Sequence, residues 1–225
     1  KLKISSIKEL EKACFENRLQ QLEGFGEKIQ LKVLSEISFL AQTKGQYLIH
    51  EAMKVALELK DYMEKCKNVD YIEIAGSLRR SKEIIKDIDL VASSKNPKEV
   101  MNFFVQYPKK VRIDQEGETK SSIIIENGMS IDLRVVTSDE FPYALHHFTG
   151  SKEHNTAIRV RAKTMGLKLN EYGLFKGEEI LRCKDEDSIY KSLKLQFIPP
   201  EMRENRGEIE LAEEEKIPKL IELKD

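Results

Sequence analysis

The first third of the chain carries apolar residues at helical spacing. Ile7, Leu10, Ala13, Cys14 and Leu19 share one face of a first segment, and Ile29, Val33, Leu34, Ile37 and Leu40 share one face of a second. Apolar positions three and four residues apart are typical of an α-helix with one buried side. The pattern therefore predicts two amphipathic helices here and a third helix over about residues 48–66.

From residue 71 onward, short strands alternate with helices. Strands are predicted at 71–75, 88–93, 110–115, 121–126 and 129–136, and helices at 97–105, 139–147 and 153–165. Gly117 and Asn127-Gly128 mark hairpin turns, and shorter strands follow at 167–170, 173–175 and 178–181. We expect an α+β fold with a mixed sheet, largely antiparallel in its middle. Pro199-Pro200 and the acidic tail are expected to form an edge segment or a linker.

A Gly-Ser turn follows the first of these strands. Gly76 allows a sharp turn and the close approach of a ligand, and Ser77 is a good N-cap for a helix over Leu78–Glu83. The free N–H groups at a helix start bind anions, and Arg79 and Arg80 add positive charge beside them. The pattern predicts a phosphate-binding turn, although an ordinary capped surface helix has the same pattern.

Two aspartates stand two residues apart on the next predicted strand. Because side chains alternate along a strand, Asp87 and Asp89 share one face and Ile88 points to the other. Neighbouring carboxylates repel each other unless a cation lies between them, and Mg²⁺ prefers such oxygen ligands. The spacing indicates a metal site, and a strand with one solvated face remains the alternative.

A third carboxylate lies on a later strand. In residues 130–136, Ile131, Leu133 and Val135 alternate with a more polar set that includes Asp132 and Arg134. If this strand pairs beside the one that carries the first two aspartates, three carboxylates converge and can hold two Mg²⁺ ions. Spacing along the chain does not establish that pairing.

A Gly-x-Gly hairpin separates the first two helices. Gly24, Gly26 and Lys28 expose backbone N–H groups and a positive charge. Such groups contact phosphate oxygens of DNA without reading its sequence. We expect a DNA-binding hairpin, and a plain helical turn with a glycine C-cap is the alternative.

Composition restricts these functions only slightly. The chain has 225 residues, of which 34% are charged, and its net charge is −1, so nucleic-acid binding would depend on local basic patches. Three widely spaced cysteines indicate neither a disulfide framework nor a zinc site, and they fit a reducing cytoplasm. No apolar stretch could cross a membrane and no signal peptide is seen, so we expect a cytoplasmic protein.

Taken in order, these motifs resemble those of the family X DNA polymerases of the bacterial and archaeal type. The segments that carry the resemblance are 24–28, 76–89 with Asp132, 147–155, 167–175 and 198–208. They span nearly the whole chain, and their combination is far more specific than any one of them. The resemblance implies a helix-hairpin-helix subdomain at 1–66, a nucleotidyltransferase palm at 67–140, and a nucleotide-selecting subdomain with a tail at 141–225.

The resemblance also implies an activity and a set of site residues. The expected reaction adds deoxynucleotides to a primer 3′ hydroxyl on gapped DNA, with two Mg²⁺ or Mn²⁺ ions, by a monomeric enzyme of DNA repair. The metal ligands would be Asp87, Asp89 and Asp132, and the nucleotide would contact Gly76, Ser77, Arg80, Lys86, His147, Phe148, Gly150 and Asn155. DNA would contact Gly24, Gly26, Lys28, Arg134 and Arg159, with a monovalent cation at the hairpin.

Three positions depart from the family pattern. Lys86 stands where glycine is usual, His147 where tyrosine is usual, and Ser130 where a basic residue is frequent. No residues match the family's N-terminal small domain or its C-terminal phosphoesterase domain, so we expect a core excised from a longer protein. The alternatives are a template-independent or non-DNA nucleotidyltransferase, and a DNA-binding module with impaired catalysis.

Overall fold

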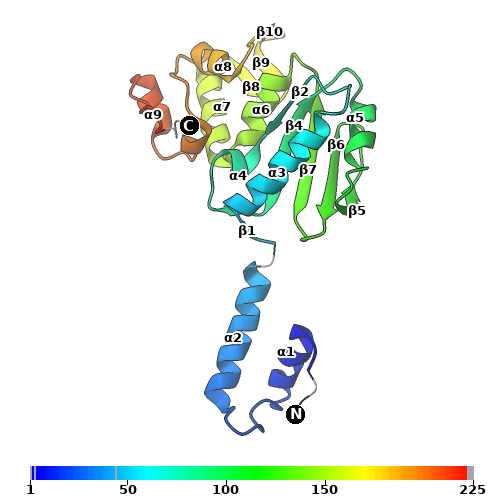
Figure 1. Cartoon of the computed structure of the whole chain (residues 1–225). Helices are drawn as coiled ribbons and strands as arrows, with labels where there is room; N and C mark the ends of the chain where they lie inside the picture. The colour runs from blue at the N-terminus through cyan, green and yellow to red at the C-terminus, as the bar shows by residue number, and fades with distance from the viewer. Residues whose placement is uncertain (1, 3, 44, 222–225) are drawn as a thin grey trace. The chain divides into compact units, whose positions relative to one another are not determined.

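The computed structural model describes residues 2, 4–43 and 45–221, and the side chains of residues 39–43 are left out of the description. The chain forms two compact units, Lys1–Gln46 and Tyr47–Asp225. Each unit is described by itself (Figure 1). No helix in the described ranges combines the length and the apolar character that crossing a membrane requires.

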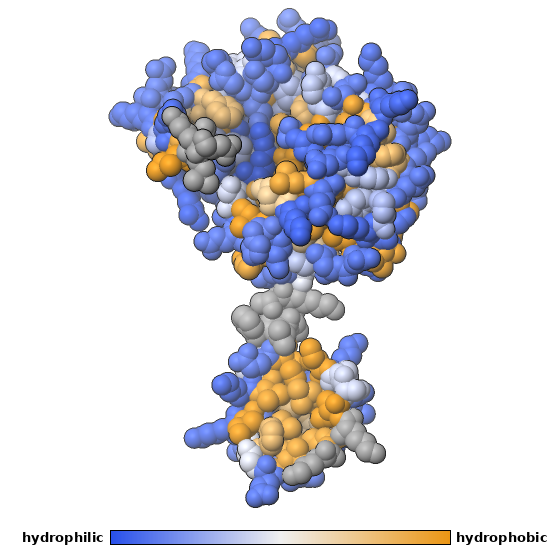
Figure 2. Space-filling view, in the orientation of Figure 1, coloured by the Kyte–Doolittle hydropathy of each residue, from blue (hydrophilic) through white to orange (hydrophobic). Residues whose placement is uncertain are grey.

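The first unit consists of α1 (Ile7–Phe15) and α2 (Glu27–Thr43). The Ser6 side chain caps α1 by accepting a hydrogen bond from Glu9 N at 3.2 Å. The helix α1 is shorter than the apolar pattern predicted, because the chain turns after Phe15. Leu19, the last residue of that pattern, is still buried. Figure 2 shows apolar side chains on the surface of this unit, where Phe15 is 71% exposed. The predicted face residue Leu40 lies outside the described side chains.

A five-stranded mixed sheet forms the centre of the second unit. Its strands are β2 (Tyr71–Ile74), β4 (Asp87–Ser93), β5 (Lys110–Gln115), β6 (Lys120–Ile125) and β7 (Ser130–Val136), in the order β2-β4-β7-β6-β5. The central pair β4–β7 is parallel and the other pairs are antiparallel, so the expectation of an antiparallel middle is wrong for that pair. The correction matters because parallel pairing brings the same ends of β4 and β7 together.

Helices cover both faces of this sheet. On one face, α3 (Ile49–Met63) and α5 (Pro97–Phe104) bury Ala56, Leu59 and Phe104 against strand residues (Figure 1). On the other face, α6 (Phe141–Thr149) buries Ala144 against Val91. The compact unit therefore begins at Tyr47, before α3, whereas the predicted helical subdomain extends to residue 66. The functional division at 66 and 140 stays a prediction.

The C-terminal part adds a small core of its own. It contains α7 (Lys152–Thr164), the three-stranded sheet of β8 (Lys168–Asn170), β9 (Gly173–Lys176) and β10 (Glu179–Leu181), then α8 (Glu186–Ser192), a 3-10 turn η1 (Pro200–Met202) and α9 (Glu208–Glu213). A two-residue ladder also joins β1 (Tyr47–Leu48) to β3 (Ile84–Ile85). The sequence pattern indicated neither this ladder nor α8 and α9.

The segment after Pro199 is packed into the domain. The expectation of an edge segment or linker is wrong for residues 200–213, because Arg203 is wholly buried and Ala212 is 1% exposed. The Arg203 guanidinium binds Glu186 Oε1 at 2.5 Å and donates to the Ile198 carbonyl at 2.9 Å. A buried ion pair of this kind cannot be recognised from local hydrophobic periodicity, since both residues are charged.

Candidate active site

The pairing of β4 with β7 brings the aspartates together. Asp89 lies directly opposite Asp132 in the parallel register, and Asp87 lies opposite Ser130. Ile88 is fully buried on the other face. The pairing that spacing along the chain left open is therefore present, and it places the three carboxylates on neighbouring strands.

The electrostatics of Asp89 reflect this crowding. Burial raises its pKa most, the nearby Asp87 and Asp132 carboxylates raise it further, and the result is a pKa of about 7. Lys120 lowers that pKa in part, and its Nζ also lies 3.3 Å from Asp132 Oδ2. The cluster therefore carries more negative charge than its protein surroundings neutralise.

This donor set has the chemistry of a site for hard divalent cations. Carboxylate oxygens are the ligands that Mg²⁺ and Mn²⁺ prefer, and a cation relieves the repulsion that raises the Asp89 pKa. Within residues 2, 4–43 and 45–221, no group of three or more His, Cys, Asp and Glu side chains is already arranged to hold a metal ion. The three carboxylates are chemically suited to bind such an ion. The Lys120 ammonium neutralises part of their negative charge.

The turn after β2 lies against the aspartates. The helix α4 spans only Gly76–Arg79, with Ala75 as its N-cap, so the predicted N-cap at Ser77 is wrong by two positions. Gly76 has φ +61°, and a Cβ atom placed on it would lie 2.0 Å from Asp89 Oδ2. Only glycine fits this turn, because both its backbone conformation and its contact with Asp89 exclude a side chain.

The two arginines of the turn have separate partners. Arg79 donates to Thr149 Oγ1 and to Glu186 Oε2, each at 2.6 Å. Arg80 donates from Nε to Glu204 Oε1 at 2.8 Å and from Nη1 to the Thr149 carbonyl at 2.6 Å. The turn is thereby fixed to the C-terminal part of the domain.

A cavity of about 680 Å³ opens beside these groups. Its lining includes all of the predicted nucleotide contacts except Lys86, namely Gly76, Ser77, Arg80, His147, Phe148, Gly150 and Asn155. The predicted metal ligands Asp87 and Asp89 and the predicted DNA contact Arg159 also line it. A smaller cavity of about 150 Å³ is lined by Asp89, Asp132, Arg134 and Phe148, among others. Lys86 is exposed and lines neither cavity, so its nucleotide contact stays a prediction.

Side chains that line the two cavities hold one another in place. Asn155 Nδ2 donates to the His147 carbonyl at 2.7 Å, and Arg159 Nη2 lies 2.7 Å from His147 Nδ1. The Arg134 guanidinium lies over the Phe148 ring, 4.7 Å from its centroid. Asn155 Oδ1 is buried and has no hydrogen-bond partner among the described residues.

The predicted DNA-binding hairpin lies in the first unit. Gly24 has φ +87°, and both Gly24 and Gly26 have open space around the position of a Cβ atom. Lys28 is exposed in the first turn of α2, where Ile29 N and Gln30 N already donate to the Gly26 carbonyl and the N–H groups of Glu27 and Lys28 precede them at the helix start. The hairpin can present N–H groups and a positive charge to an anion.

Sequence reasoning missed several residues of the site. Lys120 contacts Asp132, and Glu204, Lys152 and Glu153 line the larger cavity. Lys120 stands at the start of a predicted strand, and its charge was the only signal available. Nothing local marks Glu204, because its contact with Arg80 spans 124 positions of the chain.

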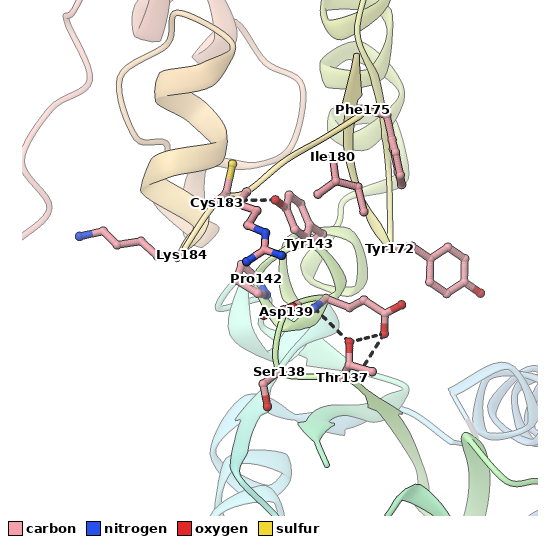
Figure 3. Close-up of a pocket in the computed structure, with 12 residues that line it drawn as sticks. Thr137, Ser138, Asp139, Pro142, Tyr143, Tyr172, Phe175, Ile180, Cys183 and Lys184 are labelled. Atoms are coloured by element: carbon pink, nitrogen blue, oxygen red, sulfur yellow. Dashed lines mark hydrogen bonds between the residues drawn. The ribbon is translucent and has the colours of Figure 1, made fainter. Parts of the chain in front are cut away.

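A cavity of about 740 Å³ lies elsewhere, between the start of α6 and the small sheet. Figure 3 shows Tyr172, Phe175 and Ile180 on its sheet side, and Cys183 N donating to Tyr143 Oη at 2.7 Å. None of the three aspartates lines it. The volume of a cavity therefore does not identify the site. The carboxylates and arginines that line the 680 Å³ cavity identify it as the candidate.

Comparisons with known proteins agree with this geometry. Residues 144–204 match the family description "DNA polymerase beta thumb". The chain is 35% identical over 213 residues to the DNA polymerase/3′-5′ exonuclease PolX of Bacillus subtilis, which covers 93% of this chain and 37% of that protein. It is 30% identical over 173 residues to the repair DNA polymerase X of an African swine fever virus isolate, which covers 73% of this chain and 99% of the viral protein.

A solved structure has the same fold. A crystal structure of Leishmania infantum polymerase beta, described as a ternary P/T complex, matches with a TM-score of 0.64 at 20% identity and covers 89% of each chain. The α+β class expected from the sequence is thereby confirmed. Because the viral relative is matched over nearly its whole length, the chain belongs to the family X DNA polymerases.

Proposed function

We propose that the chain is a polymerase core that adds deoxynucleotides to a primer 3′ hydroxyl opposite a DNA template, as a monomer that fills short gaps during repair. The observation that carries this proposal is the register of Asp89 with Asp132 beside a cavity that Arg80 lines. Carboxylates and an arginine at one cavity suit phosphoryl transfer, which depends on positioning and charge neutralisation.

The aspartates supply the ligands for the divalent metal. Asp87, Asp89 and Asp132 would hold two Mg²⁺ ions, with Mn²⁺ as an alternative; when bound, the ions lower the pKa of the attacking hydroxyl and neutralise phosphate charge. Arg80 and the N–H groups of the Gly76 turn bind the β- and γ-phosphates. Asp132, on the strand next to β6, helps to activate the primer 3′ hydroxyl.

The remaining lining residues position the nucleoside. Phe148 and Gly150 contact the sugar, and Asn155 Oδ1, which lacks a partner among the described residues, accepts a hydrogen bond from the edge of the base. His147 is held by Arg159, so the side chain that borders the sugar is fixed before the nucleotide arrives.

DNA binding uses contacts that do not read sequence. The hairpin residues Gly24, Gly26 and Lys28 bind the phosphate backbone. The hairpin carbonyls coordinate a monovalent cation. Arg159 contacts the template strand, and Arg134 is a further DNA contact. These contacts supply affinity and register, whereas the template base determines which nucleotide enters.

Primer extension on a single-nucleotide gap with Mg²⁺ tests the proposal. Asp132→Ala should abolish template-directed addition, and Asp114→Ala is the matched control because this carboxylate is 54% exposed on β5 and pairs with Arg112. Gel-shift affinity for the gapped DNA should be nearly unchanged in both variants. Untemplated addition by the wild-type chain, or full activity in Asp132→Ala, would refute the proposal.

A further inference from the structure

The Glu204 carboxylate is bound by two cations at the edge of the nucleotide cavity. Its Oε1 accepts from Arg80 Nε at 2.8 Å, and its Oε2 lies 3.4 Å from Lys82 Nζ. Arg80 and Glu204 both line the 680 Å³ cavity. Both carboxylate oxygens thus take the positions that two phosphate oxygens would take on the same cations.

Of the two neighbouring arginines, only Arg80 is available to exchange its carboxylate partner for an incoming anion. Arg79 pairs with Glu186, whose carboxylate is 7% exposed and is shared with the wholly buried Arg203. The cavity lining includes Arg80 and does not include Arg79. Arg80 is therefore the arginine that an incoming anion meets, and Glu204 is its present partner.

The Arg80 guanidinium does not depend on Glu204 for its position. Nη1 donates to the Thr149 carbonyl at 2.6 Å, and Thr149 is wholly buried. A Cβ atom on Gly150 would lie 3.1 Å from the same Nη1, so the backbone closes around this side of the guanidinium. Arg80 can keep its place when the carboxylate leaves.

Glu204 can leave by turning its side chain alone. The preceding residue is anchored, because the Arg203 carbonyl accepts from Ser151 N at 3.0 Å and the Arg203 guanidinium is buried. The Glu204 side chain itself is 21% exposed. Burial raises its pKa, but the hydrogen bond and charge of Arg80 outweigh burial and lower it, so the carboxylate is ionised at neutral pH.

We propose that Glu204 competes with the nucleotide triphosphate for Arg80 and Lys82, occupying the phosphate position in the empty enzyme and rotating away when the triphosphate binds. This inference rests on the proposed function, because it takes the cavity as the nucleotide site. A carboxylate carries one charge, so a triphosphate displaces it readily and a weakly charged anion does not. Glu204 thereby selects highly charged phosphate chains over orthophosphate.

Calorimetric titration of the full chain with inorganic tripolyphosphate, without metal or DNA, tests the competition. Glu204→Gln should bind tripolyphosphate about five- to tenfold more tightly than wild type, since no ion pair has to be broken first. Glu213→Gln is the matched control, because the Glu213 side-chain carboxylate pairs with Arg161, is 60% exposed and does not line the cavity. Deoxyadenosine should bind all three proteins equally. In primer extension, Glu204→Gln should lower KM for the nucleotide.

The results separate competition from two other outcomes. Equal or weaker tripolyphosphate binding by a Glu204→Gln protein that melts at the wild-type temperature would overturn the proposal and make Glu204 a positioning residue for Arg80. If that variant does not fold, Glu204→Asp decides, with an intermediate gain expected and wild-type or weaker affinity refuting it. Tighter binding by the variant together with no extension by wild type would refute the polymerase function and leave the competition standing.

Discussion

The backbone of Gly76 lies against the side chain of Asp89, so closely that a Cβ atom on Gly76 would sit 2.0 Å from Asp89 Oδ2. The preceding residue reinforces the contact, because Ala75 N donates to the Asp89 carbonyl at 2.8 Å. The turn that is proposed to bind phosphate and the strand that is proposed to bind metal are therefore one packed unit. A change in either displaces the other.

Replacing Gly76 with alanine should abolish primer extension and destabilise the chain by more than about 2 kcal/mol, because a left-handed backbone and a steric clash add up. Gly177→Ala is the control: this glycine has φ +63° but open space around it, so only the backbone cost of about 1 kcal/mol applies. Urea denaturation and a gap-filling assay measure both effects. Equal losses in the two variants would show that the Asp89 contact has no consequence.

Replacing Glu186 with glutamine should cost about 3 kcal/mol of stability, because it leaves Arg203 charged, buried and without a counter-ion. The matched control is Asp187→Asn on the same helix, whose ion pair with Lys191 is exposed and should contribute less than about 0.5 kcal/mol. Urea denaturation at pH 7 compares the two. A loss below 1 kcal/mol in Glu186→Gln would mean that water or another group compensates Arg203.

Stability should fall in acid between about pH 4.5 and pH 2. Burial raises the pKa of Glu186, but the charges and hydrogen bonds of Arg203 and Arg79 outweigh it and lower the pKa to about 2. Burial also raises the pKa of Glu208, and hydrogen bonds from His154 and backbone N–H groups outweigh it and lower the pKa to about 2. In the unfolded chain the pKa of a glutamate is about 4.3. The stabilisation by these two glutamates is therefore complete above that pH, and it is lost as the pH falls toward their pKa in the folded chain.

Urea denaturation at pH 7, 5 and 3 checks this dependence. The midpoint should change little between pH 7 and 5 on account of these two groups and drop between pH 5 and 3. In Glu186→Gln the drop should be smaller, because one of the two depressed carboxyl groups is gone. A wild-type midpoint that is the same at pH 5 and pH 3 would contradict the assignment.

Replacing Lys28 with alanine should weaken binding to all DNA sequences alike and reduce the salt slope of binding by about one unit, because one phosphate contact is lost. Lys12→Ala is the control, since this lysine lies on α1 and pairs with Glu16. Fluorescence anisotropy over a range of salt concentrations measures the slope. Loss confined to one sequence would mean that Lys28 contacts bases.

The local parts of the site could be predicted from the sequence. Alternation along β4 placed Asp87 and Asp89 on one face, and it placed Asp132 on the polar face of β7, because strand geometry is a property of neighbouring residues. The glycine at 76 indicated a sharp turn for the same reason. The register that brings Asp89 opposite Asp132 needed the folded sheet, since the two residues lie 43 positions apart in the sequence.

The parts that escaped prediction depend on contacts between charged residues. Arg203 and Glu208 lie in a segment whose composition is typical of a solvated tail. Both are buried, and each has a charged or polar partner there: Glu186 for Arg203 and His154 for Glu208. The helix α4 was expected to start at Leu78, after an N-cap at Ser77, yet it starts at Gly76, because the close packing against Asp89 determines the turn. Propensity describes what a segment prefers alone, and here its partners decide the outcome.

The long reach of the arginine contacts has a consequence for synthesis. The strands that carry the three aspartates are complete at Val136, whereas the partners of Arg79 and Arg80 follow 107 and 124 positions after them. On the ribosome, the carboxylate strands can therefore pair while both arginines still lack their counter-ions. Until Glu204 emerges, the nascent domain exposes an arginine whose intended partner does not yet exist, and any cellular polyphosphate or nucleic acid can bind it first.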